Sequence, residues 1–241
     1  MNKFIQAIKD LNQPFIKELL QKDSKWISWH EDNGKNALHY LCAVEISKQP
    51  QKAETSLQIL KLLLKIGMDI NSIHSIPGNC DSFPATPLWY AYTHGRNPRL
   101  FTYLLKSGAN PNNCMFAIAW YNDVKAAELF KKNGAKIEND DGKNTPFLAA
   151  FTWKKFNVAK WFLQNGANVN AYDNDGNTAL FYAVKRKYEI EYIELLLQFK
   201  ADFNKENNEG ISPKNLAELN RQKKILSLFN TNKNLSANQA P

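Results

Sequence analysis

The sequence is poor in cysteine. Its three cysteines, Cys42, Cys80 and Cys114, are an odd number at unrelated spacings. A disulfide scaffold would have an even set at regular spacings, whereas a reducing compartment permits isolated thiols. We therefore interpret all three as free thiols and expect the chain to be cytoplasmic.

Long apolar runs are also missing. The longest, at 59–64 and 192–197, are interrupted by Lys or Glu and are far shorter than the roughly 20 apolar residues that cross a bilayer. The first ten residues are charged and amphipathic, without the continuous apolar stretch of a secretory signal. We therefore predict neither a membrane span nor a signal peptide.

The formal net charge of +8 is not concentrated in one region. Basic residues are dense only at 185–187 and at 221–224, and short basic runs on helices are usually solvated faces. A nucleic acid or an anionic membrane is bound by a dense basic patch. Nucleic acid is therefore not the expected partner, although an anionic-ligand module that uses Lys185, Arg186 and Lys187 stays open as the alternative.

Motifs of catalysis are absent. The sequence has no Gly-x-Ser-x-Gly, no Gly-x-x-x-x-Gly-Lys-Ser/Thr and no His-Glu-x-x-His. Nucleophilic catalysis needs Ser, Cys or Thr beside a general base, and the four histidines offer few pairings. We predict no catalytic residue.

The spacing of the histidines and cysteines does not indicate a metal site either. His39 and Cys42 are one helical turn apart, and His74, Cys80 and Asp81 share a short segment. A zinc site needs about four ligands with paired close spacings, and these residues do not supply the pairs. We predict no metal and no cofactor.

What the sequence does contain is an internal repeat of about 33 residues. Related segments that each begin a unit occur at 36–39, 86–89, 114–117, 145–148, 178–181 and 212–215. Each of the first five is followed by an apolar segment and a turn, at 67–71, 108–112, 134–138, 166–170 and 200–204. Two independent signals thus recur in one register.

The residues of the repeat suit a pair of helices. Thr or Ser before Pro, as at Thr86, Thr145 and Ser212, supplies an N-cap oxygen, and Pro fits the first helical position. A Gly after the second apolar segment tolerates the left-handed backbone that ends a helix. Each unit is therefore predicted to be two helices followed by a turn.

These segments resemble the repeat of the ankyrin family, which opens with Thr-Pro-Leu-His-x-Ala and closes with Leu-Leu-x-x-Gly-Ala-Asp-Val-Asn. The resemblance implies an all-α solenoid over residues 1–230, with about five internal helix-turn-helix repeats, short β-turn fingers and capping helix pairs at both ends. Helices at Phe4–Leu11 and Phe15–Gln21 would form the first cap and Ser212–Asn230 the last. Residues 231–241 are polar and are predicted to be disordered.

The family resemblance also bears on location and on His39. Some ankyrin proteins are injected into host cells by intracellular bacteria, so an exported effector that acts in the cytosol of a host cell stays open beside a cytoplasmic protein. His39 occupies the family's Thr-Pro-Leu-His position, where the imidazole is expected to tie together the loop backbone of adjacent repeats.

The chain departs from the family pattern in three places. One repeat carries two insertions, at 45–55 and 72–85. The repeat that opens at Cys114 lacks both Thr and Pro, and Lys200 stands where the other turns have Gly. Long insertions are often functional, so we predict partner contacts at Ile73, Ile76 and Phe83, with packing of the insertion on its own repeat as the alternative.

Helical geometry selects a binding face. With about 100° per residue, positions two, five and six after a core residue such as Leu88 point away from the core. The residues selected in this way as partner-binding are Tyr90, His94, Tyr121, Asn122, Trp153, Tyr182, Lys185 and Arg186. Aromatic side chains and Arg are enriched at protein interfaces. The alternative, for Tyr40, Tyr90 and Tyr182, is packing between repeats.

A second aromatic set, Tyr92, Trp120 and Phe151, falls on the core side and is predicted to be buried. Taken together, these features predict a non-enzymatic scaffold that is monomeric on its own and binds another protein through the first helix of each repeat and the fingers. The sequence does not identify that protein.

Overall fold

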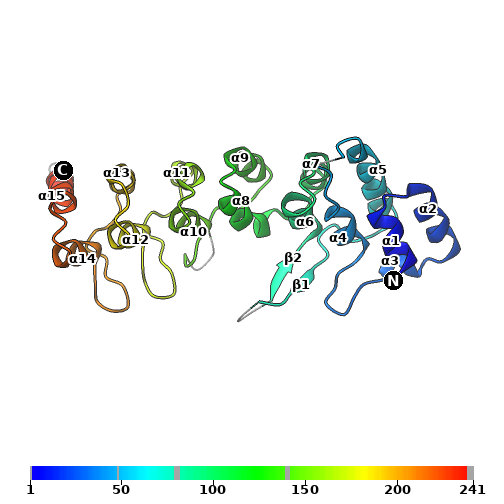
Figure 1. The fold of residues 1–241 in the computed structure, drawn as a ribbon, viewed down its shortest axis with the longest axis horizontal. Helices are drawn as coiled ribbons and strands as arrows, with labels where there is room; N and C mark the ends of the chain where they lie inside the picture. The colour runs from blue at the N-terminus through cyan, green and yellow to red at the C-terminus, as the bar shows by residue number, and fades with distance from the viewer. Residues whose placement is uncertain (1, 48, 79–81, 139–141, 238–241) are drawn as a thin grey trace. The chain divides into compact units, whose positions relative to one another are not determined.

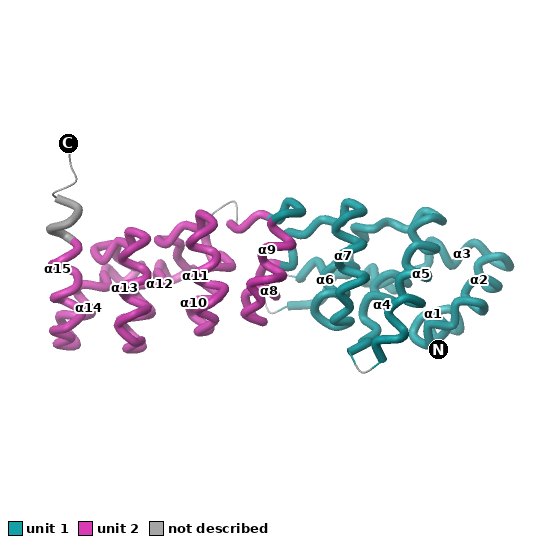
Figure 2. The backbone as a smooth tube through the Cα atoms, turned by 90° about the horizontal axis from the view of Figure 1, so that it is seen from above, with its two compact units in different colours: residues 1–114, 132–135 teal, residues 115–131, 136–241 magenta. Residues whose placement is uncertain are grey.

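The computed structural model describes residues 2–47, 49–78, 82–138 and 142–237 (Figure 1). Contacts within the chain divide it into two compact units, which Figure 2 shows in different colours. Unit 1 comprises Met1–Cys114 with Lys132–Ala135, and unit 2 comprises Met115–Lys131 with Lys136–Pro241. The division falls at the start of the repeat that lacks Thr and Pro.

Unit 1 consists of helices and one β-hairpin. Its elements are α1 (Lys3–Lys9), α2 (Gln13–Lys22), α3 (Lys25–Ser28), α4 (Ala37–Cys42), α5 (Lys52–Lys65), β1 (His74–Ile76), β2 (Phe83–Ala85), α6 (Pro87–Thr93), α7 (Pro98–Lys106) and a 3-10 turn at Asn112–Cys114. Helices α4 and α6 pack side by side, as do α5 and α7, so successive repeats stack through like helices. The predicted first cap is confirmed as α1 and α2, with α3 added.

Unit 2 repeats the same pairing. Its helices are α8 (Met115–Tyr121), α9 (Val124–Lys132), α10 (Pro146–Thr152), α11 (Phe156–Gln164), α12 (Ala179–Lys185), α13 (Ile190–Gln198), α14 (Pro213–Leu219) and α15 (Lys223–Ala237). The first helices of the repeats, α8, α10, α12 and α14, contact one another in that order. Each unit is thus a row of helix pairs, as the sequence predicts.

The helices begin where the sequence supplies capping oxygens. The side-chain oxygens of Thr86, Thr145 and Thr178 each accept a hydrogen bond of 3.2 Å from the backbone N–H three residues on, and Ser212 does so at 3.1 Å. These caps satisfy donors that the first turn of a helix leaves unpaired, which contributes about 1 kcal/mol each. The predicted starts are confirmed.

The second helices end in left-handed turns. Gly67, Gly108, Gly134 and Gly166 have φ angles between 87° and 95°, and Lys200 adopts φ 65° at the equivalent place. The N–H of Ala201 bonds the carbonyl of Leu196 at 3.0 Å, just as Ala167 bonds Phe162 at 3.0 Å. Lys200 therefore forms the same turn as the glycines but with a side chain that strains it.

The insertion at 72–85 is an antiparallel hairpin rather than an irregular loop, with His74 opposite Ala85 and Ile76 opposite Phe83. Its base lies against the preceding finger, because the N–H of Ser75 donates to the carbonyl of Asn33 at 2.8 Å. A Cβ at Gly34 would lie 2.3 Å from the carbonyl oxygen of Ile73, so only glycine permits this approach.

Two predicted boundaries are corrected. The insertion at 45–55 is shorter than expected, because residues from Lys52 onward already belong to α5. The predicted disordered tail from residue 231 is wrong as far as Ala237, where α15 ends; residues 238–241 lie outside the described part. The apolar side chains Ile225 and Phe229 are buried and hold the start of α15.

No helix in the described ranges has both the length and the apolar character of a membrane crossing.

Candidate functional site

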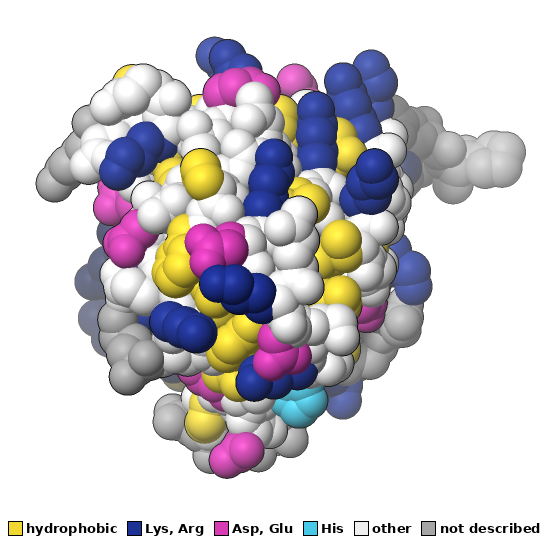
Figure 3. Space-filling model, turned by 90° about the vertical axis from the view of Figure 1, so that its right-hand side faces the viewer, with side chains coloured by type: hydrophobic (Ala, Val, Ile, Leu, Met, Phe, Trp, Pro, Cys, Tyr) yellow, Lys and Arg dark blue, Asp and Glu magenta, His cyan; other side chains and the backbone are white. Residues whose placement is uncertain are grey.

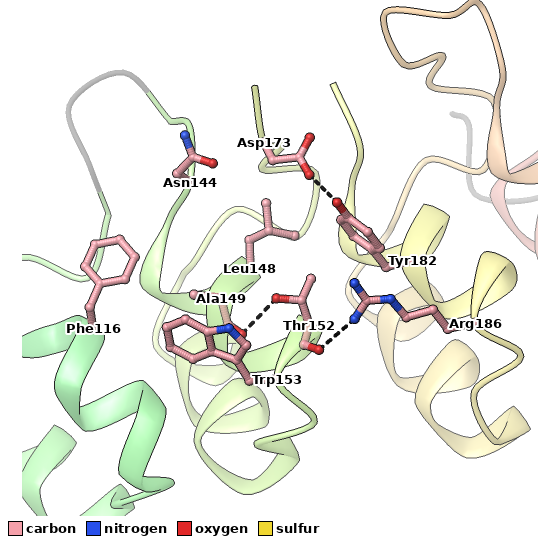
Figure 4. A pocket seen from close by; sticks show the side chains of 9 residues that line it. All are labelled: Phe116, Asn144, Leu148, Ala149, Thr152, Trp153, Asp173, Tyr182 and Arg186. Carbon is pink, nitrogen blue, oxygen red and sulfur yellow. Dashed lines mark hydrogen bonds between the residues drawn. The ribbon is translucent and has the colours of Figure 1, made fainter. Parts of the chain in front are cut away.

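Unit 2 contains a pocket of about 310 Å³ beside the first helices of its repeats (Figure 4). Its walls come from helices α8, α10 and α12. The residues directly after α10 and α12, and the β-turn fingers directly before these two helices, complete the walls. The lining residues are Phe116, Asn144, Leu148, Ala149, Thr152, Trp153, Asp173, Tyr182 and Arg186. Three of the predicted partner-binding residues, Trp153, Tyr182 and Arg186, thus meet at one site.

Two tryptophans are exposed next to this pocket. Trp153, directly after α10, is 40% exposed, and Trp120, near the end of α8, is 55% exposed. Their rings meet edge to face, with centroids 5.2 Å apart and an angle of 81° between the planes, which is a favoured aromatic geometry. Tyr121, also 40% exposed, follows Trp120 at the end of α8. Solvent-exposed aromatic area of this kind is typical of a binding surface.

The exposure of Trp120 overturns the prediction that it is core, whereas Tyr92 and Phe151 are buried as expected. Phe151 is enclosed by Phe156 and Tyr188, with ring centroids 5.4 and 5.8 Å away. For Trp120, the following repeat has Lys155 at the place equivalent to Tyr188, and the Nζ of Lys155 lies 5.5 Å from the centre of the Trp120 ring. A lysine side chain covers far less aromatic surface than a tyrosine ring.

Arg186 closes the other side of the pocket. Its Nη1 donates to the carbonyl of Thr152 at 2.9 Å, and its guanidinium carbon lies 4.6 Å from the centre of the Tyr182 ring. These contacts fix an exposed cation at the rim. The neighbouring Lys185 is exposed as well.

The carboxylate of the pocket, Asp173, is engaged within the fold. Its Oδ2 accepts from the hydroxyl of Tyr182 at 2.5 Å, and its Oδ1 accepts from the N–H groups of Asp175 at 3.0 Å and Asn177 at 2.9 Å. Partial burial, followed by the hydrogen bond to Asp173, raises the pKa of the Tyr182 hydroxyl, which therefore stays protonated and donates. Both oxygens of the carboxylate are thus occupied in ordering the finger.

We predicted Tyr90 to lie in an exposed groove, and this prediction is wrong, because Tyr90 is only 4% exposed. The hairpin places His74 over it, with Nδ1 of His74 and the Tyr90 hydroxyl 2.7 Å apart. The alternative, packing between repeats, is what the structure has. His94 remains exposed and lies beside Tyr90, with ring centroids 4.9 Å apart.

Asn122, predicted as a partner contact, is half-buried and has a structural role in the turn after α8; its contact with a partner stays a prediction. It follows α8 in a left-handed conformation with φ 54°, and its Oδ1 accepts from the N–H of Val158 at 3.0 Å. That hydrogen bond joins the turn after α8 to the second helix of the next repeat.

The three predicted contact residues of the insertion at 72–85 differ in their exposure. Ile73 is 55% exposed and is accessible to a partner. Ile76 and Phe83 are half-buried, and Phe83 packs on Trp89 with centroids 5.1 Å apart. For Phe83 the alternative holds, since the hairpin packs on its own repeat.

His39 has the structural role that the family resemblance implies. It is fully buried, its Nδ1 accepts from the N–H of Asn36 at 3.2 Å, and its Nε2 then donates to the carbonyl of Ser72 at 3.1 Å. Burial lowers the pKa of His39 from about 6.5 to about 4, so the ring is neutral. The imidazole ties the finger of one repeat to the turn of the next.

The described residues contain no group of three His, Cys, Asp or Glu side chains that could hold a metal ion; Cys80 and Asp81 lie outside them. Cys42 and Cys114 are free and buried, as predicted, and burial raises the pKa of both thiols. Unreactive thiols of this kind pack as small apolar groups.

Exposed cations occur in both units. On the face that the N-terminal helices of unit 1 present, Lys and Arg side chains alternate with acidic and hydrophobic ones (Figure 3). In unit 2, Lys154, Lys187 and Arg221 occupy equivalent turns after α10, α12 and α14, with φ between 53° and 58°, and all three are exposed.

Sequence reasoning missed part of the pocket. Leu148, Asn144 and Asp173 were not among the predicted contacts, although they line it. Leu148 lies at a core position of α10, and the other two lie on fingers whose approach to the helices depends on the next repeat. The Asn-, Asp- and Gly-rich turn sequences that recur before the first helices could have indicated that Asn144 and Asp173 lie near the binding face.

Comparison with known proteins gives consistent matches. Residues 114–207 match the family model described as ankyrin repeats (3 copies), and residues 85–115 match the model described as ankyrin repeat. An ankyrin repeat protein of fowlpox virus is 31% identical over 143 residues, which are 53% of this chain and 42% of that protein.

The phosphocholine transferase AnkX of Legionella pneumophila is 28% identical over 170 residues, covering 66% of this chain but 17% of that protein. The chain therefore spans less than half the length of both relatives. Among solved structures, the ankyrin repeat domain of Bcl-3 superposes with a TM-score of 0.71 at 20% identity, covering 95% of this chain and 98% of that one.

Proposed function

Because this chain belongs to the ankyrin-repeat family, whose repeats are in general non-catalytic protein-binding modules, we propose that unit 2 binds a segment of a partner protein. The binding region comprises Phe116, Trp120, Tyr121, Trp153, Tyr182 and Arg186, and is called the Trp120–Trp153 surface below. We assign no catalytic reaction to this surface. The one carboxylate among the residues that line the pocket, that of Asp173, accepts hydrogen bonds from Tyr182 and from the backbone of its own finger.

The observation that carries this proposal is the exposed tryptophan pair at the edge of the pocket. Trp and Tyr bury large apolar areas on binding while losing little side-chain entropy, and hot spots of protein interfaces are enriched in Trp, Tyr and Arg. Trp120, Trp153 and Arg186 provide two of these three residue types on adjoining repeats, around a hollow that a partner side chain can fill.

The test is quantitative affinity capture from cell lysate with the full chain, followed by mass spectrometry. Trp153→Ala and Trp120→Ala should reduce recovery of the same partner at least tenfold, because hot-spot truncations cost about 2 kcal/mol or more. Leu219→Ala is the matched control, since Leu219 is an exposed apolar side chain of unit 2 outside this surface. Equal recovery with all variants would contradict the proposal.

A second candidate function is the binding of an anionic ligand. It is favoured by Lys154, Lys187 and Arg221, which place one exposed cation at the equivalent turn of three successive repeats. Binding of this kind is electrostatic and weakens steeply with salt. Absence of binding to labelled single-stranded DNA or to phosphoinositide vesicles at low salt would eliminate it.

We also propose that the protein acts in a cytosol, its own or that of a host cell. The support is the pair of free buried thiols, Cys42 and Cys114, since such thiols persist in reducing compartments. Fractionation of the source cells and of any infected cells, with detection of the tagged chain, would distinguish the two locations.

A further inference from the structure

We propose that the segment bound at the Trp120–Trp153 surface is an acidic stretch of a partner protein that inserts one large apolar side chain into the pocket. This inference rests on the proposed function and adds the chemistry of the partner. It follows from two features of unit 2: cations without carboxylate partners around the aromatic pair, and a neighbouring hollow whose walls include Phe116, Leu148 and Trp153.

A cation lies near each tryptophan. The Nζ of Lys155 is 5.5 Å from the centre of the Trp120 ring, and Arg186 lines the pocket with Trp153. Lys154 directly precedes Lys155, in the exposed turn after α10, with its Nζ 5.0 Å from the centre of the Tyr188 ring. The aromatic surface therefore has positive groups on more than one edge.

These cations are not neutralised within the fold. The ion pairs identified in the described residues, such as Lys22 with Glu18 and Arg99 with Glu54, lie in unit 1. For Lys154, Lys155 and Arg186 the described residues provide no carboxylate within ion-pair distance. Arg186 uses Nη1 for the Thr152 carbonyl and, at 3.4 Å, for the hydroxyl of Tyr188, which leaves its Nη2 and Nε for a carboxylate.

The nearby carboxylates are engaged. Asp173 accepts from the hydroxyl of Tyr182 and from two backbone N–H groups. Asp123, just beyond the end of α8, accepts from the N–H of Ala126 at 3.0 Å and caps α9. Both carboxylates thus accept hydrogen bonds that order their own turns. A partner with carboxylates gains charge complementarity here, whereas a basic partner meets like charge.

The hollow adds an apolar requirement. Phe116, Leu148 and Trp153 contribute walls of the pocket, as the close-up shows. Burying an aliphatic or aromatic side chain there removes apolar surface from water at roughly 25 cal/mol per Å². A peptide can place an aliphatic or aromatic side chain in the pocket, whereas a single-stranded nucleic acid would stack its bases on the exposed tryptophans, and the oligonucleotide arm of the test distinguishes the two.

The test is a display selection of random 12-residue peptides on the immobilised full chain, followed by fluorescence polarisation with synthetic copies of the enriched peptides. We expect the enriched peptides to contain several Asp or Glu residues around a Leu, Ile, Phe or Trp. Replacing those acids by Asn and Gln should weaken binding about tenfold, since each charge-assisted hydrogen bond is roughly a tenfold effect. Replacing the apolar residue by Ala should do the same.

Variants of the protein locate the contact. Trp153→Ala should weaken the acidic peptide about 30-fold and Arg186→Gln about tenfold, while Lys160→Gln on α11, an exposed cation away from the surface, should leave affinity unchanged. Because Trp153 is 40% exposed and lies after the end of α10, the circular dichroism of each variant should match that of the wild type. Trp120→Ala provides a second truncation of the same pair.

Three other outcomes would overturn the inference, each in a different way. Enriched peptides that are neutral or basic yet lose affinity in Trp153→Ala would refute the acidic partner and leave the proposed function intact. Peptides whose affinity no surface variant changes, or a library without enrichment, would refute both. A single-stranded oligonucleotide of equal charge that binds more tightly than the peptides would assign the surface to nucleic acid instead.

Discussion

The hydroxyl of Tyr90 lies 2.7 Å from Nδ1 of His74, and this buried hydrogen bond fastens the inserted hairpin to α6. The rings of the two residues also stack, with centroids 5.8 Å apart and planes 18° from parallel. An insertion that could have been a free surface loop is therefore part of the packed structure of unit 1.

Removal of that hydroxyl should loosen the hairpin. Tyr90→Phe keeps the ring but leaves the His74 nitrogen without its partner, which costs about 1–3 kcal/mol for a buried polar group. Hydrogen exchange of the hairpin amides, such as Ser75, should accelerate accordingly. Tyr103→Phe on α7 is the matched control, because the described residues offer its hydroxyl no hydrogen bond. Unchanged protection in Tyr90→Phe would contradict the role of this bond.

Acidic pH should destabilise unit 1 through His39. The pKa of His39 is about 4 in the folded chain, against about 6.5 for an exposed histidine. Between these values the unfolded chain binds a proton and the folded chain does not, so the free energy of unfolding falls as pH falls. The contribution is complete above about pH 6.5, is lost by about pH 4, and amounts to about 3 kcal/mol.

Urea unfolding at about pH 7.5 and about pH 5 measures this effect, which for His39 alone should be about 2 kcal/mol. His74 and His94 add to it, because burial first and then the charge of Lys35 lower the pKa of both. His39→Gln retains a donor toward Ser72 and removes the titration, so its stability should depend less on pH. The same pH dependence in wild type and variant would refute the assignment.

Lys200 offers a stabilising substitution. Its φ of 65° is unfavourable for a residue with a Cβ, so Lys200→Gly should raise the free energy of unfolding by up to about 1 kcal/mol. The reciprocal change, Gly166→Ala, meets no atom within 4 Å of the new Cβ and should cost a similar amount through the backbone alone. Thermal unfolding of both variants checks the pair; a destabilised Lys200→Gly would contradict the strain.

The parts of the fold that depend on neighbours in sequence were predictable. Thr145 before Pro146 specifies an N-cap, and Gly166 specifies a helix end, because both signals act within one turn of the chain. Their recurrence gave the helix pairs, and the family resemblance gave the way in which those pairs stack.

The wrong predictions concern side chains whose burial depends on parts of the chain outside their own helix. Trp120 and Phe151 occupy the same position of their helices, yet only Phe151 is covered, because the following repeat supplies Tyr188 there and Lys155 beside Trp120. Tyr90 is buried because an insertion folds into a hairpin that brings His74 over it. Helical periodicity gives the direction of a side chain but not what covers it.

The most direct test of the account is hydrogen–deuterium exchange of the full chain with and without its tightest display-selected peptide, whatever the charge of that peptide. The proposed function predicts protection at the end of α8, at the turn after α10 and at the turn after α12, around Trp120, Trp153 and Arg186. Protection confined to the second helices α11 and α13, or to unit 1, would contradict the claim that the Trp120–Trp153 surface binds the partner.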